Sequence, residues 1–148
     1  IPTIDRSVYA SAEGVSKGAY VLEDFGTGKP DLILMATGSE VDLILQAGKK
    51  LADKGHSVRV VSFPSWELFE KTDQGYKDSV LLPDVKRRLA VEMGVSQGWE
   101  KWVGCNGKIL TMNGFGASAP YLTLLEKFGF TVENICQIAL SMINAEVK

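Results

Sequence analysis

A continuous apolar run near the amino terminus constrains the fold more than any other feature of the sequence. Residues 31–36 read Asp-Leu-Ile-Leu-Met-Ala, with no alternation between apolar and polar side chains. Such a run is typical of a strand that is buried on both faces. Thr37-Gly38-Ser39-Glu40 follows at once, and an amphipathic stretch then extends from about Glu40 to Lys54. The sequence therefore predicts a strand, a turn and a helix of an α/β domain.

Strand-like and helix-like segments alternate along the rest of the chain. The link between the first two strands, residues 25–30, is short and favours an antiparallel pair, because parallel strands need a long crossover. The later strands are separated by helices, which predicts βαβ units with right-handed crossovers. We therefore expect the α/β class, as a three-layer α/β/α domain with a mixed, mostly parallel five-stranded sheet whose first strand is antiparallel. The expected strands are Gly18–Asp24, Asp31–Ala36, Ser57–Ser62, Lys86–Glu92 and Lys108–Met112.

The helices are predicted from apolar spacing and from capping residues. Two short helices are expected within residues 65–82, and Trp99 and Trp102 share one face of another short helix. A helix is expected over Ala119–Lys127, and Thr131 is expected to cap the last helix.

Composition places the chain among ordinary globular domains. Its 148 residues suit one domain, and 45% of them are apolar. The net charge of −2 gives no electrostatic reason to expect binding to nucleic acid or to an anionic membrane. The only basic triplet, Lys86-Arg87-Arg88, is interpreted as a solvated surface with helix-end electrostatics. No apolar run approaches the roughly 20 residues of a membrane span, so we expect a cytoplasmic protein.

The usual catalytic residue types are sparse. His56 is the only histidine, it lies in a predicted loop, and the sequence offers no Ser-His-Asp or Cys-His set around it. Cys105 and Cys136 are far apart and are expected to be two reduced thiols. The large aromatic residues are expected mostly in the core, although exposed ones would mark an interface.

One turn is a candidate binding site for an anion. Thr37, Gly38 and Ser39 join the buried strand to a helix, whose free backbone N–H groups and dipole favour negative charge. The alternative is simple capping, in which Thr37 or Ser39 satisfies the same donors. Glu40 acts against a bound phosphate because it adds negative charge at the same place.

A second turn between a strand and a helix, Phe115-Gly116-Ala117-Ser118-Ala119-Pro120, completes a set of segments that resembles one family. Between about Gly18 and Met142 the chain resembles the carboxy-terminal domain of transketolase. Seven matching segments occur in the order expected for that domain. They are Tyr20–Leu22, Ala36–Val41, Val60–Pro64, Ala90–Gly94, Trp102–Gly104, Phe115–Pro120 and Phe128–Asn134.

The resemblance implies a transferase that moves a two-carbon ketol unit between phosphorylated sugars. It implies thiamine diphosphate and a divalent metal for the intact enzyme, which would be a homodimer of three-domain chains. The cofactor and the substrate would be held by the upstream domains, so no catalytic, cofactor-binding or metal-binding residue is expected in this chain. Residues 1–17 are interpreted as a linker from a missing upstream domain, and residues 18–148 as the transketolase C-terminal domain. The start at Ile1, without Met, is consistent with a cut from a longer chain.

The expected function is therefore that of a non-catalytic domain that stabilises the dimer and the contacts between domains. Its partners would be the upstream transketolase domains and a second protomer, with no nucleic acid and no membrane. Two alternatives remain open at this point: a regulatory module that binds an anion or nucleotide at Thr37, Gly38 and Ser39, and a plain oligomerisation domain.

Overall fold

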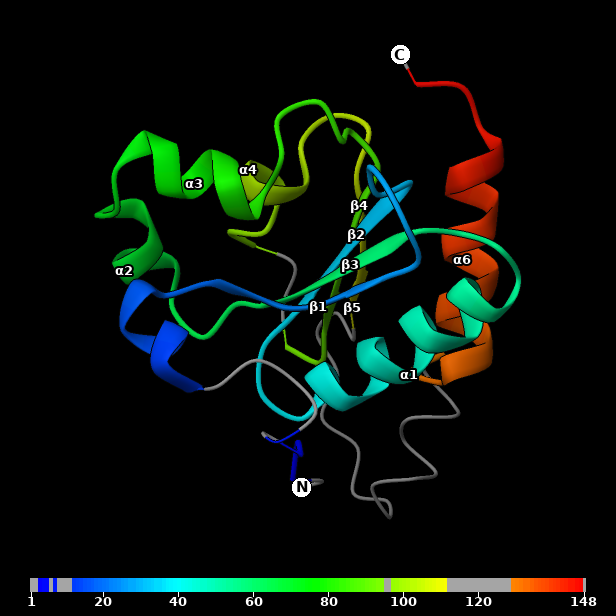
Figure 1. Cartoon of the computed structure of the whole chain (residues 1–148), viewed down its shortest axis with the longest axis horizontal. Coiled ribbons are helices and arrows are strands. Elements are labelled where there is room, and N and C mark those ends of the chain that lie inside the picture. The colour runs from blue at the N-terminus through cyan, green and yellow to red at the C-terminus, as the bar shows by residue number, and fades with distance from the viewer. Residues whose placement is uncertain (1–2, 6, 8–11, 95–96, 112–128, 148) are drawn as a thin grey trace.

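A mixed five-stranded sheet forms the centre of the structure, with helices on both faces (Figure 1). The computed structural model describes residues 3–5, 7, 12–94, 97–111 and 129–147. The strand order in the described part is β1-β3-β2-β4-β5. The strands are β1 (Tyr20–Phe25), β2 (Leu32–Ala36), β3 (Val58–Ser62), β4 (Arg88–Glu92) and β5 (Lys108–Thr111).

Strand β1 is antiparallel, as predicted, but its partner is β3 and not β2. β2 lies at the centre and pairs in parallel with β3 on one side and β4 on the other. The link at residues 25–30 reaches across the amino end of β3, where the Thr27 N–H donates to Ser57 Oγ at 3.1 Å and the Ser57 N–H donates to Asp31 Oδ2 at 3.0 Å. The predicted pairing of the first two strands is wrong because this short link spans one intervening strand.

In the part of the chain that the structure describes, two long helices cover one face of the sheet and three short helices cover the other (Figure 1). On the first face lie α1 (Glu40–Asp53) and α6 (Val132–Asn144). On the second lie α2 (Trp66–Glu70), α3 (Gln74–Val80) and α4 (Glu100–Val103). The structure confirms the two short helices predicted for residues 65–82. It also confirms Thr131 as the cap of the last helix, because its hydroxyl accepts from the Asn134 N–H at 3.1 Å.

Alternating side chains of the central strands divide the interior into two cores. From β2, Leu32, Leu34 and Ala36 face α1 and α6, whereas Ile33 and Met35 face the short helices. All five are fully buried, which confirms that this apolar run is a strand covered on both faces. The first core is mostly aliphatic. The second is rich in aromatic rings, which come from Phe63, Phe69, Trp99 and Trp102.

Part of the segment before β1, which the sequence predicts to be a linker, is helical. Residues Ala12–Lys17 form a 3-10 helix, η1, which contacts α2 and β1. Gly18 ends it in a left-handed conformation with φ of 82°, where a Cβ would collide with the backbone of Ser65 and Phe69. Whether residues 1–17 serve as a linker between domains stays a prediction.

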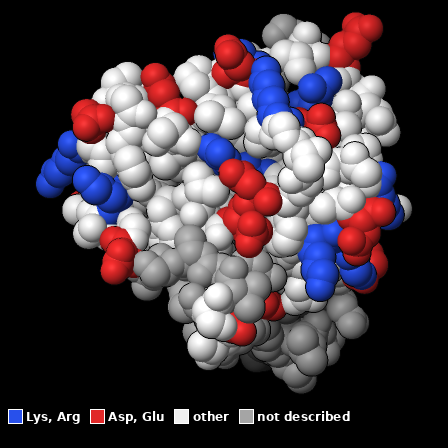
Figure 2. All heavy atoms as spheres, in the orientation of Figure 1, with Lys and Arg blue, Asp and Glu red and all other residues white. Residues whose placement is uncertain are grey.

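Charged side chains are intermixed on the face of the molecule shown in Figure 2, and neither sign dominates there. Within the basic triplet, Arg87 and Arg88 are half-buried and donate to main-chain carbonyls at helix ends. The predicted helix-end electrostatics is therefore confirmed for both arginines, although neither side chain is fully solvated. The predicted turn Phe115–Pro120 and helix Ala119–Lys127 lie outside the described residues.

Candidate functional site

The carboxyl ends of β2 and β4 mark the point where the order of strands reverses. After β2 the chain continues to β3 on one side, and after β4 it continues to β5 on the other. Open α/β sheets bind ligands in the crevice outside the carboxyl ends of strands at such a point. Ala36 is paired with Val91, so the turn that follows β2 lies beside Glu92 at the end of β4. We call these carboxyl ends and the residues that follow them the carboxyl edge.

Two carboxylates meet at the carboxyl edge. Glu40 begins α1 and is only 5% exposed, and its Oε2 accepts from Ser39 Oγ at 3.4 Å. Burial raises the pKa of Glu40 above its ordinary value, and the nearby charge of Glu92 raises it further. Sequence reasoning did not bring Glu40 and Glu92 together. The available signal was their position after two strands whose carboxyl ends share one edge.

Glu92 is held by two donors from the loop that follows β4. The Trp99 indole donates from Nε1 to Glu92 Oε2 at 3.3 Å, and the Gly94 N–H donates to Oε1 at 2.9 Å. These two hydrogen bonds fix the position of the Glu92 side chain at the end of β4. The pair therefore consists of one buried carboxyl group and one carboxylate that is fixed by hydrogen bonds.

A pocket of about 300 Å³ opens at the carboxyl edge. Its wall combines aromatic and proline rings with hydroxyl and carboxylate groups. The lining residues are Thr37, Phe63, Pro64, Ser65, Trp66, Glu67 and Glu92. Two of these described lining residues are acidic and none is basic, so they suit a neutral polar or cationic group better than an anion.

The predicted anion site, Thr37, Gly38 and Ser39, lies at this edge between β2 and α1. Ser39 occupies the N-cap position of α1, but its backbone is helical and its side chain makes no capping hydrogen bond. Of the two residues that the capping alternative offered, Ser39 does not cap α1, because its hydroxyl donates to the Glu40 carboxyl group instead. Anion binding at this turn stays a prediction, and the charges of Glu40 and Glu92 oppose it.

The remaining candidate side chains lie elsewhere. His56 precedes β3 and is half-buried at the amino end of the sheet, opposite the carboxyl edge. Cys105 is exposed and Cys136 is buried, and both are free thiols, as expected. Trp99 and Trp102 are buried in the second core, whereas Phe115 and Phe128 lie outside the described residues.

Comparison with known proteins identifies the family. The family model described as "Transketolase-like TK C-terminal domain" matches residues 18–131 of the 148. The chain belongs to the transketolase C-terminal domain family. The resemblance inferred from the short sequence segments is thereby confirmed.

Individual transketolases agree with this assignment. The chain is 51% identical to a transketolase of Aquifex aeolicus over 91% of its own length and 19% of the relative. It is 47% identical to a transketolase of Geobacillus stearothermophilus over 91% of its length and 20% of that relative. The solved transketolase from Leishmania mexicana superposes with a TM-score of 0.81 at 38% identity, covering 94% of this chain and 21% of that one. The chain thus spans about a fifth of the length of these relatives.

The carboxyl edge of this transketolase domain does not fit a bound thiamine diphosphate. At the carboxyl edge a diphosphate would face Glu40 and Glu92, and like charges repel. No group of three or more His, Cys, Asp or Glu side chains in the described ranges is placed to hold a metal ion. In the same ranges no helix is both long and apolar enough to cross a bilayer.

The Glu40–Glu92 pair predicts a pH-dependent stability. The pKa of Glu40 is raised in the folded state, so ionisation of Glu40 destabilises the folded state relative to the unfolded chain. Glu40→Gln should therefore stabilise the domain above the folded pKa of Glu40. This advantage should shrink as the pH falls through that pKa and vanish below the ordinary value of 4.5. Urea unfolding of both proteins across this pH range measures the difference.

Glu67→Gln is the matched control, since Glu67 is an exposed glutamate of the same edge. It removes an exposed carboxylate from the same edge and should change the free energy of unfolding by less than about 0.5 kcal/mol. A Glu40→Gln protein that is less stable than the wild type at neutral pH would show that Glu40 contributes favourable contacts as a carboxylate.

Proposed function

We propose that this chain works as the carboxy-terminal domain of a transketolase, an enzyme that transfers a two-carbon ketol unit between phosphorylated sugars. Thiamine diphosphate and a divalent metal would supply the chemistry in the intact enzyme, held by upstream domains. The observation that carries the proposal is the family match over residues 18–131 of a chain that spans only about a fifth of its transketolase relatives.

The proposed role of the domain is to stabilise the intact enzyme. Residues 3–5 run below the start of α1 in Figure 1, and Ile4 packs against the first core. Residues 3–5 therefore lie against the folded domain near the start of α1. We expect the upstream domains to contact the carboxyl edge, where the pocket lined by Thr37 and Trp66 opens to the surface.

The purified chain alone should transfer no ketol units. A mixture of a ketose phosphate, an aldose phosphate, thiamine diphosphate and Mg²⁺ should stay unchanged, since the catalytic residues are proposed to lie upstream. Titration calorimetry should give no heat of cofactor binding, while circular dichroism shows a folded domain. The Geobacillus stearothermophilus transketolase serves as the positive control. Turnover by the fragment would contradict the proposal.

A domain exchange tests whether this chain can serve as the carboxy-terminal domain of an intact transketolase. In the Geobacillus stearothermophilus enzyme the matching segment can be replaced by this chain, which is 47% identical to it. The chimera should remain dimeric and keep most of its activity, whereas deleting the segment should lower the unfolding temperature of the enzyme. A chimera that folds but is inactive would show that the domain does more than stabilise.

Two finer points belong to the same proposal. The intact enzyme is expected to be a homodimer in the cytoplasm that acts in the pentose phosphate pathway. Analytical ultracentrifugation of the isolated chain separates two roles: a monomer supports contacts within one protomer, and a dimer supports contacts between protomers.

A further inference from the structure

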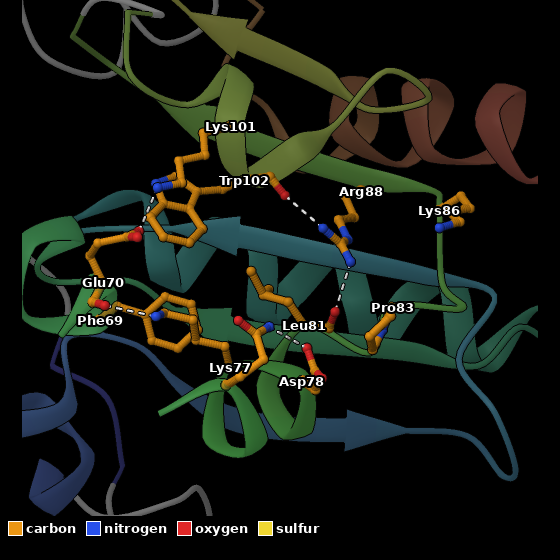
Figure 3. A pocket seen from close by; sticks show the side chains of 11 residues that line it. Phe69, Glu70, Lys77, Asp78, Leu81, Pro83, Lys86, Arg88, Lys101 and Trp102 are labelled. Carbon is orange, nitrogen blue, oxygen red and sulfur yellow. Dashed lines mark hydrogen bonds and ion pairs between the residues drawn. The ribbon is translucent and has the colours of Figure 1, made fainter. Parts of the chain in front are cut away.

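A second pocket lies under the short helices, at the other end of β4 from the carboxyl edge (Figure 3). It is formed by α2, α3, α4 and the loop that leads into β4, and its volume is about 350 Å³. This volume falls within the range of small-molecule sites. Arg88 begins β4 and lines this pocket, whereas Glu92 ends the strand at the carboxyl edge. The two pockets are therefore separate sites.

The floor of the second pocket is apolar and rigid. Phe69, Leu81 and Trp102 line it and are otherwise buried in the second core. The rings of Phe69 and Trp102 pack against each other with centroids 5.3 Å apart. A flat apolar group that enters the pocket would contact the edges of side chains whose positions are set by packing in the second core.

Two lysines of the pocket are held in place by protein groups. Lys77 Nζ donates to the main-chain oxygens of Glu70 and Thr72, at 2.7 and 3.0 Å. Lys101 Nζ lies 2.6 Å from Glu70 Oε2 and 5.1 Å from the centre of the Trp102 ring. Each ammonium group has three N–H donors, so these contacts leave further donors available.

Two other cations of the pocket, Lys86 and Arg88, have N–H donors that are free to bind a ligand. Lys86 is exposed, and within the described ranges no hydrogen bond or ion pair to its ammonium group is found. Arg88 donates to four main-chain carbonyls, and its guanidinium carries five N–H donors. The carboxylates of the pocket are Glu70, which is paired with Lys101, and Asp78, which accepts from Gln74 Nε2 at 2.8 Å. Four cations therefore face two carboxylates, and the pocket is net positive.

We propose that this pocket binds a small organic phosphate. Its phosphate group would be received by Lys86 and Arg88 at one end of the pocket, and its apolar part would extend toward Trp102 (Figure 3). Lysine and arginine donors recognise phosphate oxygens through charge-assisted hydrogen bonds. The apolar floor favours an organic phosphate over the free ion, because contact with the ring edges removes apolar surface from water.

Phenyl phosphate is a suitable probe because it combines a ring with a phosphate dianion. We expect the 148-residue chain to bind it with a Kd of roughly 0.1–1 mM and to bind inorganic phosphate several-fold more weakly. Two-dimensional ¹H–¹⁵N spectra locate the ligand: the indole N–H of Trp102 and the amide of Lys101 should shift, and the indole N–H of Trp66 should not.

A pair of charge reversals tests the role of Lys86. Lys86→Glu should raise the Kd at least about tenfold, since it replaces the free cation with an anion. Lys49→Glu is the matched control, because Lys49 is an exposed lysine on α1, on the other face of the sheet. It makes the same change of net charge and should alter the Kd less than about twofold. Should Lys86→Glu lower the unfolding temperature, Lys86→Gln replaces it with the same expected direction.

Three results would overturn the inference. The first is the absence of any shift at Trp102 in the wild type up to about 10 mM phenyl phosphate, a concentration well above the expected Kd. The second is equal weakening by Lys86→Glu and Lys49→Glu, which would indicate attraction by the net charge of the surface. The third is equal affinity for inorganic phosphate, which would exclude a contribution from the apolar floor.

Discussion

Replacing Phe63 by alanine should destabilise the domain by about 4 kcal/mol, because it removes the ring at the centre of the second core. Phe63 is 1% exposed, and its ring centroid lies 5.0 Å from that of Phe69, 5.5 Å from that of Trp99 and 5.2 Å from that of Trp102. Truncation leaves a cavity that large neighbouring rings cannot refill without changing their packing. Urea unfolding followed by tryptophan fluorescence measures the loss, and near-ultraviolet circular dichroism reports the looser aromatic packing.

Two controls accompany this variant. Phe63→Leu keeps an apolar side chain of intermediate volume and should cost about 1.5 kcal/mol or less. Leu68→Ala removes a leucine that is 42% exposed and should change the stability by less than about 0.5 kcal/mol. A loss below about 1 kcal/mol for Phe63→Ala would show that the second core can reorganise around the missing ring.

Arg88→Met should cost about 2–3 kcal/mol, because it withdraws the donors from several partly buried carbonyls. The guanidinium donates through Nη1 to Trp102 O at 3.0 Å and through Nη2 to Leu81 O at 2.7 Å (Figure 3). Nη2 also makes a longer bond, of 3.3 Å, to Leu82 O. Nε donates to Val85 O at 3.1 Å. The burial that lowers the pKa of Arg88 also keeps water from replacing all of these donors. Thermal and urea unfolding measure the effect.

Lys86→Met is the matched control for Arg88→Met, since it removes a neighbouring cation that is exposed. It should leave the free energy of unfolding within about 0.5 kcal/mol of the wild type. Arg88→Lys should restore only part of the loss, because a single ammonium group cannot reach carbonyls that surround a planar guanidinium. Equal stability of Arg88→Met and the wild type would show that water replaces the guanidinium at these carbonyls.

The central strands and long helices were predictable because the spacing of apolar residues within each segment indicates which of its faces are buried. Residues 31–36 are apolar without interruption, and the structure buries β2 on both faces. The last helix follows the same logic: the apolar residues at helical spacing face the core, with Ile135, Ala139 and Met142 buried and Ile138 and Ile143 half-buried. In both cases the pattern of one short segment is enough to specify its environment.

Features that depend on contacts between residues far apart in the sequence were not predictable. A six-residue link suggested that β1 lies beside β2, and only the contacts between Ser57 and residues 27–31 show that the link crosses the end of β3. Glutamate at the start of a helix is usually solvated, so the burial of Glu40 against β4 had no local signal. The second pocket likewise joins four separate segments of the chain, and none of them carries a recognisable motif.

The helices of the two layers differ in length, and this difference affects local unfolding. α1 and α6 have 14 and 13 residues, whereas α2, α3 and α4 have 5, 7 and 4. Helices as short as these do not persist outside a tertiary context, since forming the first turn is unfavourable. The short-helix layer therefore depends on the aromatic rings beneath it and is expected to open as one cooperative unit. Its amide hydrogens would then exchange with solvent together, and earlier than those of the layer formed by α1 and α6.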